Sequence, residues 1–480
     1  MDSKIITEDT IAKDCFIFGT GAAAEKAYFL LKQKCNFYRI IGFIDNNKEK
    51  QRKKFCSIET SGIEILSSYQ KNIKIFIASI YYKEISSQLL NLGYHNFSAI
   101  CVANEDIQGA ITHFKAKTAQ RIRARVLGFD NISEEQSKEE FENTNLDIKK
   151  IFDEYLISIS ENIDDVYKPG IFWDQVINDS TCDYYRSLKY KNFQRFNKLI
   201  RNFRLFAREL GIIDGPDAFS IIDPEFNLID YIENVCYGYN ALIDIVEKKV
   251  LDYIDESPAG MPLTVEYKNR KISSETIRHA YYLNNIVKCN MYLKDNSDLI
   301  ICELGGGIGD TARQFYNYFS KNIRVTYIIL DLPEVLTISS YYLMKTFPEL
   351  KIGFYSDFRN FDTIEREIIE EYDFILLPNY MIERFGKDSI DIFINTASLG
   401  EMEKNIFSNY LKQISRITSK IFYSSNHSEI NFLLGNKKIE IGSPNYFEDS
   451  DNWKFLADIK RLSIFYSVFP EYRDLIFYKK

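Results

Sequence analysis

The stretch ICELGGGIGD, residues 301–310, places an apolar run and a glutamate directly before a cluster of glycines. The residues that follow have a helical pattern. A strand, a glycine turn and a helix in this order bring the free backbone N–H groups of a helix N-terminus to the carboxyl edge of a sheet, where α/β proteins bind ligands. The stretch therefore predicts an α/β domain with a ligand site at this turn.

Short apolar runs lie before and after this turn, with helical patterns between most of them. The runs are LIICEL, VTYIILDL, KIGFYS, DFILLP, IDIFIN and KIFYSS. Such alternation is typical of a doubly wound parallel sheet. We predict that residues 296–480 form this domain.

The first hundred residues show the same alternation, in CFIFGTG, RIIGFIDNN, KIFIASI and NFSAI. They predict a small Rossmann-like domain over 1–104. Residues 105–150 are polar and charged, as in a linker or solvated helix. In 151–295, apolar residues recur at helical spacing, which predicts a helical region that forms a lid or acceptor pocket. The fold class is therefore α/β, with two Rossmann-like doubly wound domains separated by a largely helical region.

The N-terminal domain has a glycine turn of its own. Gly19, Gly21 and Ala24 have the GxGxxA spacing, and Asp45 ends the second strand. In the dinucleotide fingerprint, such an acid accepts the ribose hydroxyls. The pattern indicates a nucleotide site, and phosphate is favoured here because no acid precedes the turn.

Composition excludes several classes of function. The chain has 480 residues, a net charge of −8 and 60 Lys plus Arg without a basic stripe, which argues against nucleic acid as a partner. Its eight cysteines form no CxxC pair and indicate reduced, buried thiols. No signal peptide or apolar run long enough for a membrane span is present, so we expect a cytoplasmic protein. The oligomeric state, including a homo-oligomer, is left open.

The glutamate before the C-terminal glycines decides between ligands. A carboxylate at Glu303 repels a pyrophosphate but favours a cation. S-adenosylmethionine (SAM) carries an ammonium and a sulfonium and no phosphate. Gly305, Gly307 and Gly309 let the backbone approach it, and Asp331 ends the next strand, where an acid accepts both ribose hydroxyls. This pattern resembles the E/DxGxGxG motif of class I SAM-dependent methyltransferases, and it predicts SAM as the cofactor.

Several elements in order resemble the bacterial putative sugar O-methyltransferase family. They are GMPLTVEYKNRKISSETIRHAYYLNNI, ICELGGGIGD, YIILDLPEVLTISSYYL, IDIFINTASLGEM and IFYSSNH, within residues 256–430. The resemblance implies a SAM-dependent O-methyltransferase that acts on a sugar hydroxyl in the biosynthesis of a surface glycan such as a capsule or lipooligosaccharide. Leu399 departs from the family's usual aromatic residue, which bears on the shape of one pocket wall.

The N-terminal domain resembles the nucleotide-sugar-binding domains that precede sugar acetyltransferases and some polysaccharide methyltransferases. FGTG, GFIDNN and a late FIAS strand carry this resemblance. It implies that the domain binds a nucleotide-linked sugar or a glycan intermediate, or that it is a docking piece.

Methyl transfer to a sugar oxygen requires a base at the strand ends. His427, after the strand IFYSSN, and Glu401, after IDIFIN, are the catalytic candidates. For Glu401 the alternative is a capping box with Ser398. His279, in the helix before the sheet, is a candidate substrate residue whose alternative is packing.

Other polar residues at strand ends are candidates for binding. Asn395 and Asn426 are suited to orienting sugar hydroxyls or to turn formation, and Asp357 to contacting the adenine amino group or to starting a turn. No compact acidic cluster nominates metal ligands, so we predict no metal. Aromatic residues suited to stacking on sugar rings, or to core packing, are Trp173, Tyr237, Tyr239 and Tyr380.

Two rival functions stay open. One is an NAD-linked or nucleotide-sugar-binding enzyme centred on the N-terminal glycine turn, which requires a catalytic group such as a Tyr-x-x-x-Lys pair beside the cofactor. The other is a non-catalytic protein that binds ligands in a glycan-assembly complex.

Overall fold

The structure is a computed structural model of the chain. It describes residues 13–21, 24–25, 27–28, 31, 38–79, 82–94, 96–102, 111–114, 124–126, 138–178, 183–201, 203–206, 228–260, 262, 264–289, 298–427, 431–434, 437–440, 452–460 and 472–480.

The chain divides into two compact units, each of which is described by itself. Unit 1 comprises Met1–Ala124, Asn227–Ile245 and Asp458–Asp474. Unit 2 comprises Arg125–Phe226, Val246–Ala457 and Leu475–Lys480. The boundaries expected from the sequence, at 104, 150 and 295, stay predictions.

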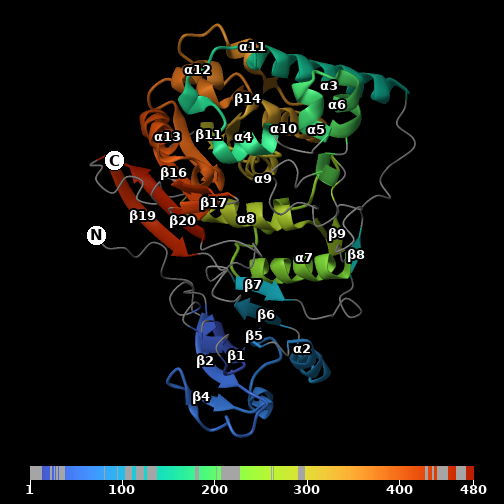
Figure 1. Cartoon of the computed structure of the whole chain (residues 1–480), viewed down its shortest axis with the longest axis vertical. Coiled ribbons are helices and arrows are strands. Elements are labelled where there is room, and N and C mark those ends of the chain that lie inside the picture. The colour runs from blue at the N-terminus through green and yellow to red at the C-terminus, as the bar shows by residue number, and fades with distance from the viewer. Residues whose placement is uncertain are drawn as a thin grey trace. The chain divides into compact units, whose positions relative to one another are not determined.

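Unit 1 contains a seven-stranded sheet of order β3-β4-β2-β1-β5-β6-β7 among the described residues (Figure 1). β1 pairs in parallel with β2 and β5, and β5 with β6. The elements are β1 (Lys13–Phe18), β2 (Tyr38–Ile44), β3 (Lys54–Phe55), β4 (Ile58–Ser61), η1 (Ile63–Ser68), β5 (Lys74–Ile77), α2 (Tyr82–Asn91), β6 (Phe97–Val102), β7 (Ile111–Phe114) and α7 (Leu228–Ile243).

Unit 2 contains an eight-stranded sheet of order β13-β14-β12-β11-β15-β16-β20-β19 in the described part of the chain. Its strands are β11 (Asp298–Leu304), β12 (Arg324–Asp331), β13 (Ile352–Gly353), β14 (Phe374–Pro378), β15 (Ile390–Thr396), β16 (Thr418–His427), β19 (Trp453–Lys460) and β20 (Tyr472–Lys479). The strands from β14 to β16 pair in parallel. The order β14-β12-β11-β15-β16 corresponds to the 3-2-1-4-5 order of a doubly wound sheet. The predicted fold class is confirmed.

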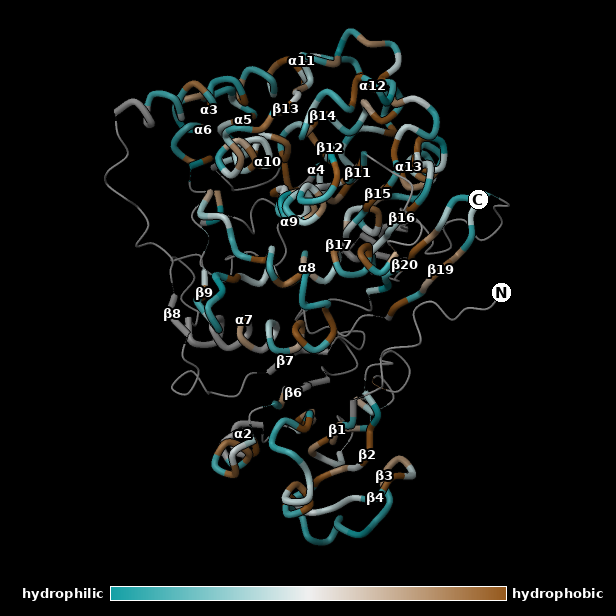
Figure 2. The backbone as a smooth tube through the Cα atoms, turned by 180° about the vertical axis from the view of Figure 1, so that it is seen from behind, coloured by the Kyte–Doolittle hydropathy of each residue, from teal (hydrophilic) through white to brown (hydrophobic). Residues whose placement is uncertain are grey.

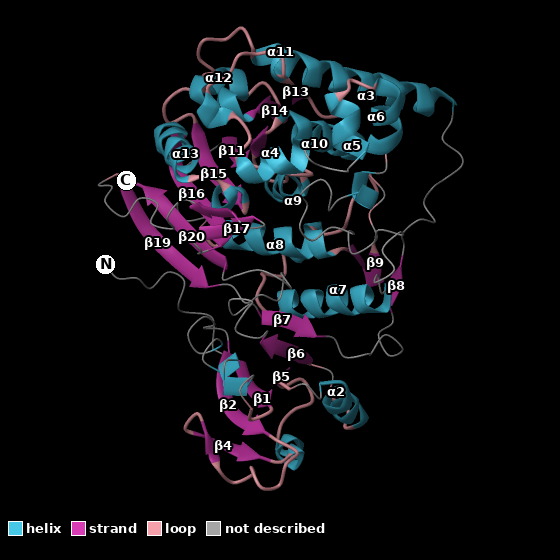
Figure 3. Ribbon diagram, in the orientation of Figure 1, coloured by secondary structure: helices cyan, strands magenta, loops and turns pink. Residues whose placement is uncertain are grey.

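Helices connect these parallel strands (Figure 3). From β11 the chain passes through α9 (Asp310–Phe319) and α10 (Pro333–Thr346) toward one edge of the sheet, and α13 (Lys404–Ile417) joins β15 to β16 toward the other. Because parallel crossovers are right-handed, the first two helices cover one face and α13 covers the opposite face. The strand order reverses at β11, which is where such sheets bind ligands.

The segment before the sheet of unit 2 is largely helical. It contains α3 (Lys138–Ser158), η4 (Asp165–Tyr167), α4 (Ile171–Asn178), α5 (Asp183–Lys189), α6 (Phe193–Ile200), η5 (Phe203–Phe206), η8 (Leu251–Tyr253) and α8 (Ser274–Val287). β9 (Val265–Tyr267) and β10 (Arg270–Ile272) form an antiparallel hairpin. Its turn residues, Lys268 and Asn269, have φ of 49° and 61°, as a type I′ turn requires.

The remaining elements are short. They are β8 (Ala124–Val126), α11 (Tyr355–Phe358), α12 (Arg366–Ile369), η10 (Asn379–Arg384), η11 (Ser398–Glu401), β17 (Asn431–Leu434) and β18 (Lys437–Glu440).

Each unit buries its own apolar cluster. The strands of unit 2 contribute buried residues such as Ile300, Ile328 and Phe393, against which α13 packs Phe407. Unit 1 buries its strand residues on both faces of its sheet. Figure 2 shows hydrophobic segments along strands of both sheets. Near-continuous apolar strands are expected because a parallel sheet is covered on both faces.

Candidate functional site

The turn after β11 has a backbone that favours glycine. Gly305, Gly307 and Gly309 have φ of 77°, 55° and 90°. A Cβ atom on Gly305 would lie 2.4 Å from the Oγ of Ser398, whereas one on Gly307 would have no heavy atom of the described residues within 4 Å. Gly309 is the N-cap of α9. The turn is therefore held tightly at its start and borders open space at Gly307.

Asp331 faces this turn from the neighbouring strand. One carboxylate oxygen accepts a hydrogen bond from the backbone N–H of Gly307 at 2.9 Å, and the other from that of Leu332 at 2.7 Å. The register pairs Leu304 with Leu330, so Glu303, one residue before the end of β11, and Asp331, at the end of β12, lie at the same edge of the sheet.

Four carboxyl groups gather at this edge of the sheet. They belong to Glu303, Asp331, Glu334 and Glu401. Burial raises the pKa of Glu303 to about 8 and those of Asp331 and Glu401 to about 7, and it also raises the pKa of Glu334. Tyr327 donates a hydrogen bond to the Oε2 of Glu303 at 3.0 Å, while Oε1 is buried without a hydrogen-bond partner among the described residues.

Glu401 is held by a residue from a distant part of the chain. The indole N–H of Trp173 donates a hydrogen bond to the Oε2 of Glu401 at 2.9 Å. Two residues on, the Oε1 of Glu403 accepts a hydrogen bond from the backbone N–H of Ile171 at 2.7 Å. α4 is therefore fixed at its first turn beside Glu401, whose Oε1 has no hydrogen-bond partner in the described part of the chain.

The side chains of Asn395 and Asn426 shape the turn that carries Glu401. Asn395 donates to the carbonyl of Leu304 at 2.9 Å and to the Oγ of Ser398 at 2.6 Å. Asn426 donates to the Oδ1 of Asn395 at 2.9 Å and accepts from the backbone N–H of Gly400 at the same distance. These contacts support the turn, and a role for either amide in binding a sugar stays a prediction.

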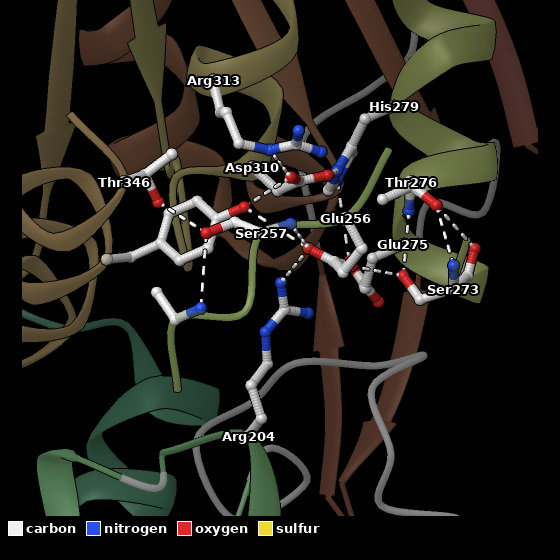
Figure 4. Close-up of polar contacts among 12 residues, drawn as sticks. Arg204, Glu256, Ser257, Ser273, Glu275, Thr276, His279, Asp310, Arg313 and Thr346 are labelled. Atoms are coloured by element: carbon white, nitrogen blue, oxygen red, sulfur yellow. Dashed lines mark hydrogen bonds and ion pairs between the residues drawn. The ribbon is translucent and has the colours of Figure 1, made fainter. Parts of the chain in front are cut away.

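Behind the glycine turn lies a buried polar network (Figure 4). Asp310, the first residue of α9, accepts hydrogen bonds from His279 Nδ1 at 2.7 Å and Arg313 Nε at 2.6 Å. Tyr342 Oη and Gln314 Nε2 also donate to it, at 2.7 Å and 3.0 Å. Arg313, His279 and Arg204 hold the pKa of Asp310 well below its usual range against the effect of burial. The network thus ties α8 and α10 to the first turn of α9.

A second buried ion pair adjoins the first. Arg204 Nη2 lies 3.0 Å from the Oε1 of Glu256, and both side chains are fully buried. Ser273 Oγ donates to the Oε2 of Glu256 at 2.5 Å. Tyr342 Oη, which bonds to Asp310, is also 3.5 Å from Glu256 Oε1. Together these contacts join the chain before the sheet to the glycine turn.

The remaining candidates lie as follows. His427 ends β16, and its side chain is outside the described residues. His279 is buried in the network, so its predicted substrate role stays a prediction. Asp357 accepts a hydrogen bond from the backbone N–H of Phe354 at 2.9 Å and caps α11. The hydroxyl of Tyr380 donates to the carbonyl of Ser158 at 3.0 Å.

The glycine turn of unit 1 is also close-packed. Gly19 has φ of 117°, and a Cβ atom there would lie 2.5 Å from the carbonyl oxygen of Ala78. Asp45 accepts a hydrogen bond from the hydroxyl of Thr20 and one from the backbone N–H of Asn47 at 2.8 Å. Both of its carboxylate oxygens therefore accept hydrogen bonds within the unit, as those of Asp331 do in unit 2. Among the described residues, no heavy atom lies within 4 Å of a Cβ atom on Gly21. The nucleotide role of Gly19, Gly21 and Asp45 stays a prediction.

The residues that the structure describes contain no group of three or more His, Cys, Asp and Glu side chains suited to a metal ion. Within the same residues, no helix is both long and apolar enough to cross a bilayer.

Apart from His279, the network residues were missed by sequence reasoning. Asp310 directly follows Gly309, so its position next to the turn was visible, but its partners were not. Arg204 and Glu256 carry no local pattern that marks them as a buried pair. Glu334 lies three residues after Asp331, and an acid at that spacing is also an ordinary first-turn residue of a helix.

Comparisons with known proteins give limited matches. The family model "C2185-like, N-terminal" matches residues 11–100. No curated protein sequence matches the chain. Solved structures match with low TM-scores, so the assignment of the fold rests on the strand order of the sheet.

Three of these structures illustrate the range. Magnesium protoporphyrin IX methyltransferase (ChlM) from Synechocystis PCC 6803, solved with SAH, is 9% identical, with a TM-score of 0.30 over 43% of this chain and 86% of that one. The DhpI–SAH complex is 10% identical, with a TM-score of 0.24 over 42% and 86%. UDP-D-quinovosamine 4-dehydrogenase from Vibrio fischeri is 18% identical, with a TM-score of 0.17 over 21% and 93%.

Proposed function

We propose that the chain is a SAM-dependent O-methyltransferase that acts on a sugar hydroxyl in the biosynthesis of a surface glycan. The observation that carries this proposal is the group of buried carboxyls around the glycine turn, with no ion pair to Lys, Arg or His in the described part of the chain. When ionised, these carboxyls would repel a phosphate-bearing ligand, because unscreened like charges interact strongly in a partly dry site. A cationic ligand supplies the charge that these carboxyls lack.

The residues at the turn fit SAM. The buried, unpartnered Oε1 of Glu303 suits a cationic donor, and Asp331 at the end of the next strand suits the ribose hydroxyls. Gly307 leaves room at the turn. When bound, SAM supplies a methyl group that its sulfonium activates for transfer to oxygen.

Glu401 is the base that we favour for the acceptor hydroxyl. Its pKa of about 7 suits a general base that works near neutral pH. Trp173 orients one oxygen, and the other is left to accept the proton that leaves the acceptor hydroxyl. A base fixed by a third group is a recurring arrangement in enzymes that activate nucleophiles. His427 remains the second candidate.

Calorimetric titration with SAM and with SAH tests the cofactor. We expect both to bind, and we expect Glu303→Gln to weaken SAM binding about 10- to 100-fold, the usual worth of a hydrogen bond to a charged group. Glu371→Gln removes an exposed carboxyl that lies 3.5 Å from Lys351, and serves as the control. Absence of binding, or SAM affinity that Glu303→Gln leaves unchanged, would contradict the proposal.

Methyl transfer itself is tested with SAM carrying a radiolabelled methyl group. Label should appear in a glycan acceptor only with the active protein, and Glu401→Gln should reduce its rate while SAM still binds. Binding without any transfer would favour the non-catalytic alternative.

A further inference from the structure

The edge of the unit 2 sheet that carries the four carboxyl side chains, called the carboxyl edge below, has no cation paired with them among the described residues. Glu303, Asp331, Glu334 and Glu401 take part in none of the ion pairs found among the described residues, and burial rather than a cation dominates the electrostatics of each. Asp310 provides the contrast: a few residues from Glu303, it is paired with Arg313. When ionised, these carboxyls repel a phosphate, and when protonated they supply no positive charge to balance it.

An apolar surface lies directly beside this edge. The indole of Trp173 is partly exposed and anchored by its N–H to Glu401. The ring of Phe172 meets it edge to face, with the centroids 5.8 Å apart, and Ile171 is 46% exposed. The first turn of α4 therefore offers an aromatic surface next to the candidate base.

We propose that the acceptor is a neutral sugar ring already joined to a glycan, that it packs against Trp173, and that no phosphate lies near its reacting hydroxyl. This inference rests on the proposed function and names its substrate class. The faces of a sugar ring carry C–H groups that suit the electron-rich face of an indole. The ring hydroxyl then lies beside Glu401.

The same geometry excludes a nucleotide-linked sugar as the acceptor. In such a sugar the diphosphate is attached to the ring that would be methylated, within about one Debye length (~8 Å) of its hydroxyls. It would therefore meet the carboxyl edge with little screening. Glycosyl transfer, which replaces the bond to the nucleoside diphosphate by a glycosidic bond, must come first and supply the acceptor. Methylation then follows on the growing or completed glycan.

The tryptophan content of the chain provides a direct probe. The chain has two tryptophans, and Trp453, in β19, donates to Ser415 Oγ away from the carboxyl edge. Trp453→Phe leaves Trp173 as the sole tryptophan. The probes are the methyl glycosides of glucose, galactose and N-acetylglucosamine, each compared with its uridine diphosphate sugar, in the presence of SAH. We expect the glycosides to change the Trp173 emission and the nucleotide sugars to bind at least tenfold more weakly.

Charge variants test the physical cause. Glu334→Gln should reduce the difference in affinity between glycosides and nucleotide sugars, and so should high salt. Glu371→Gln should leave this difference unchanged. Tighter binding of the nucleotide sugars, or no response to any glycoside, overturns the inference. SAH binding, measured on the same variant, distinguishes a failure of the proposed function from a failure of this inference. Loss of SAH binding contradicts the proposed function. Retained SAH binding with a preference for nucleotide sugars contradicts only this inference.

Discussion

The carboxyl group of Glu303 is fully buried, and burial raises its pKa to about 8. Below pH 8 the ligand-free protein therefore holds a proton on this side chain, whereas a bound cation favours the carboxylate. SAM binding must then release a proton. We expect the Kd for SAM to fall as pH rises from 6 to 8, by up to tenfold per pH unit for each proton released.

Titrations in buffers of different ionisation enthalpy measure this proton release. Glu303→Gln should reduce the pH dependence, and the part that remains should belong to Asp331, whose pKa is about 7. A SAM affinity that does not change between pH 6 and 8 would show that Glu303 does not contact the cation.

The hydrogen bond between Trp173 and Glu401 affects the pKa of the candidate base. The hydrogen bond from Trp173 lowers the pKa of Glu401 against the effect of burial, which leaves it at about 7. As the base, Glu401 must be ionised, so kcat should rise with pH through about 7. Glu401→Gln should lower kcat by about 10²- to 10⁴-fold. Trp173→Phe removes the indole donor and should move the midpoint of the profile to higher pH. A wild-type profile that is kept by Glu401→Gln would assign the base elsewhere, with His427 as the next candidate.

Two residues of the glycine turn are expected to differ in role: Gly305 in the stability of the fold and Gly307 in the binding of SAM. A Cβ atom on Gly305 would lie 2.4 Å from Ser398 Oγ, whereas one on Gly307 would meet open space. Both residues have positive φ, which costs an alanine roughly 1–2 kcal/mol. Gly305→Ala should therefore lower the free energy of unfolding more than Gly307→Ala, and Gly307→Ala should mainly weaken SAM binding. Urea unfolding and calorimetry measure the two effects. Equal losses of stability with unchanged binding would contradict the assignment.

The buried network makes α8 and α9 depend on each other. His279→Ala leaves a buried carboxylate with one donor fewer, and we expect a loss of about 1–3 kcal/mol in the free energy of unfolding. Asp310→Asn leaves the buried Arg313 without its ionic partner and should cost about 3–5 kcal/mol. The double variant should lose less than the sum, because both changes break one contact. Additive losses would show that His279 and Asp310 act independently.

The elements were predictable from sequence where their determinants are local. Apolar runs of strand length predict the parallel sheets, and the glycines with Glu303 and Asp331 predict which strand ends carry the site. The contacts that complete the site are not local. Trp173 and Glu401 are 228 positions apart, and His279 and Asp310 are 31 apart. A local pattern carries no information about such pairs, so the orientation of the candidate base and the anchoring of the turn required the structure.

At the scale of the whole molecule, each unit is assembled from separate stretches of chain. Asn227–Ile245 and Asp458–Asp474 belong to unit 1, although long stretches of unit 2 lie between them. Shifts in composition along a sequence mark only domains that are continuous in the chain. A unit built from separate stretches therefore cannot be predicted from them. One consequence is that neither unit can be isolated by a single cut in the chain.

Because each unit buries its own apolar cluster, we expect a ligand to stabilise only the unit that binds it. In calorimetric unfolding of the full chain, SAH at 100 times its Kd should stabilise the transition of unit 2 by about 2.7 kcal/mol. Gly19→Val places side-chain atoms against the Ala78 carbonyl and should lower the stability of unit 1. If the SAH-linked shift is the same in Gly19→Val as in the wild type, the cofactor site belongs to unit 2 alone. If the variant abolishes the shift, SAH binding requires unit 1, and the site cannot be formed by the carboxyl edge of the larger sheet on its own.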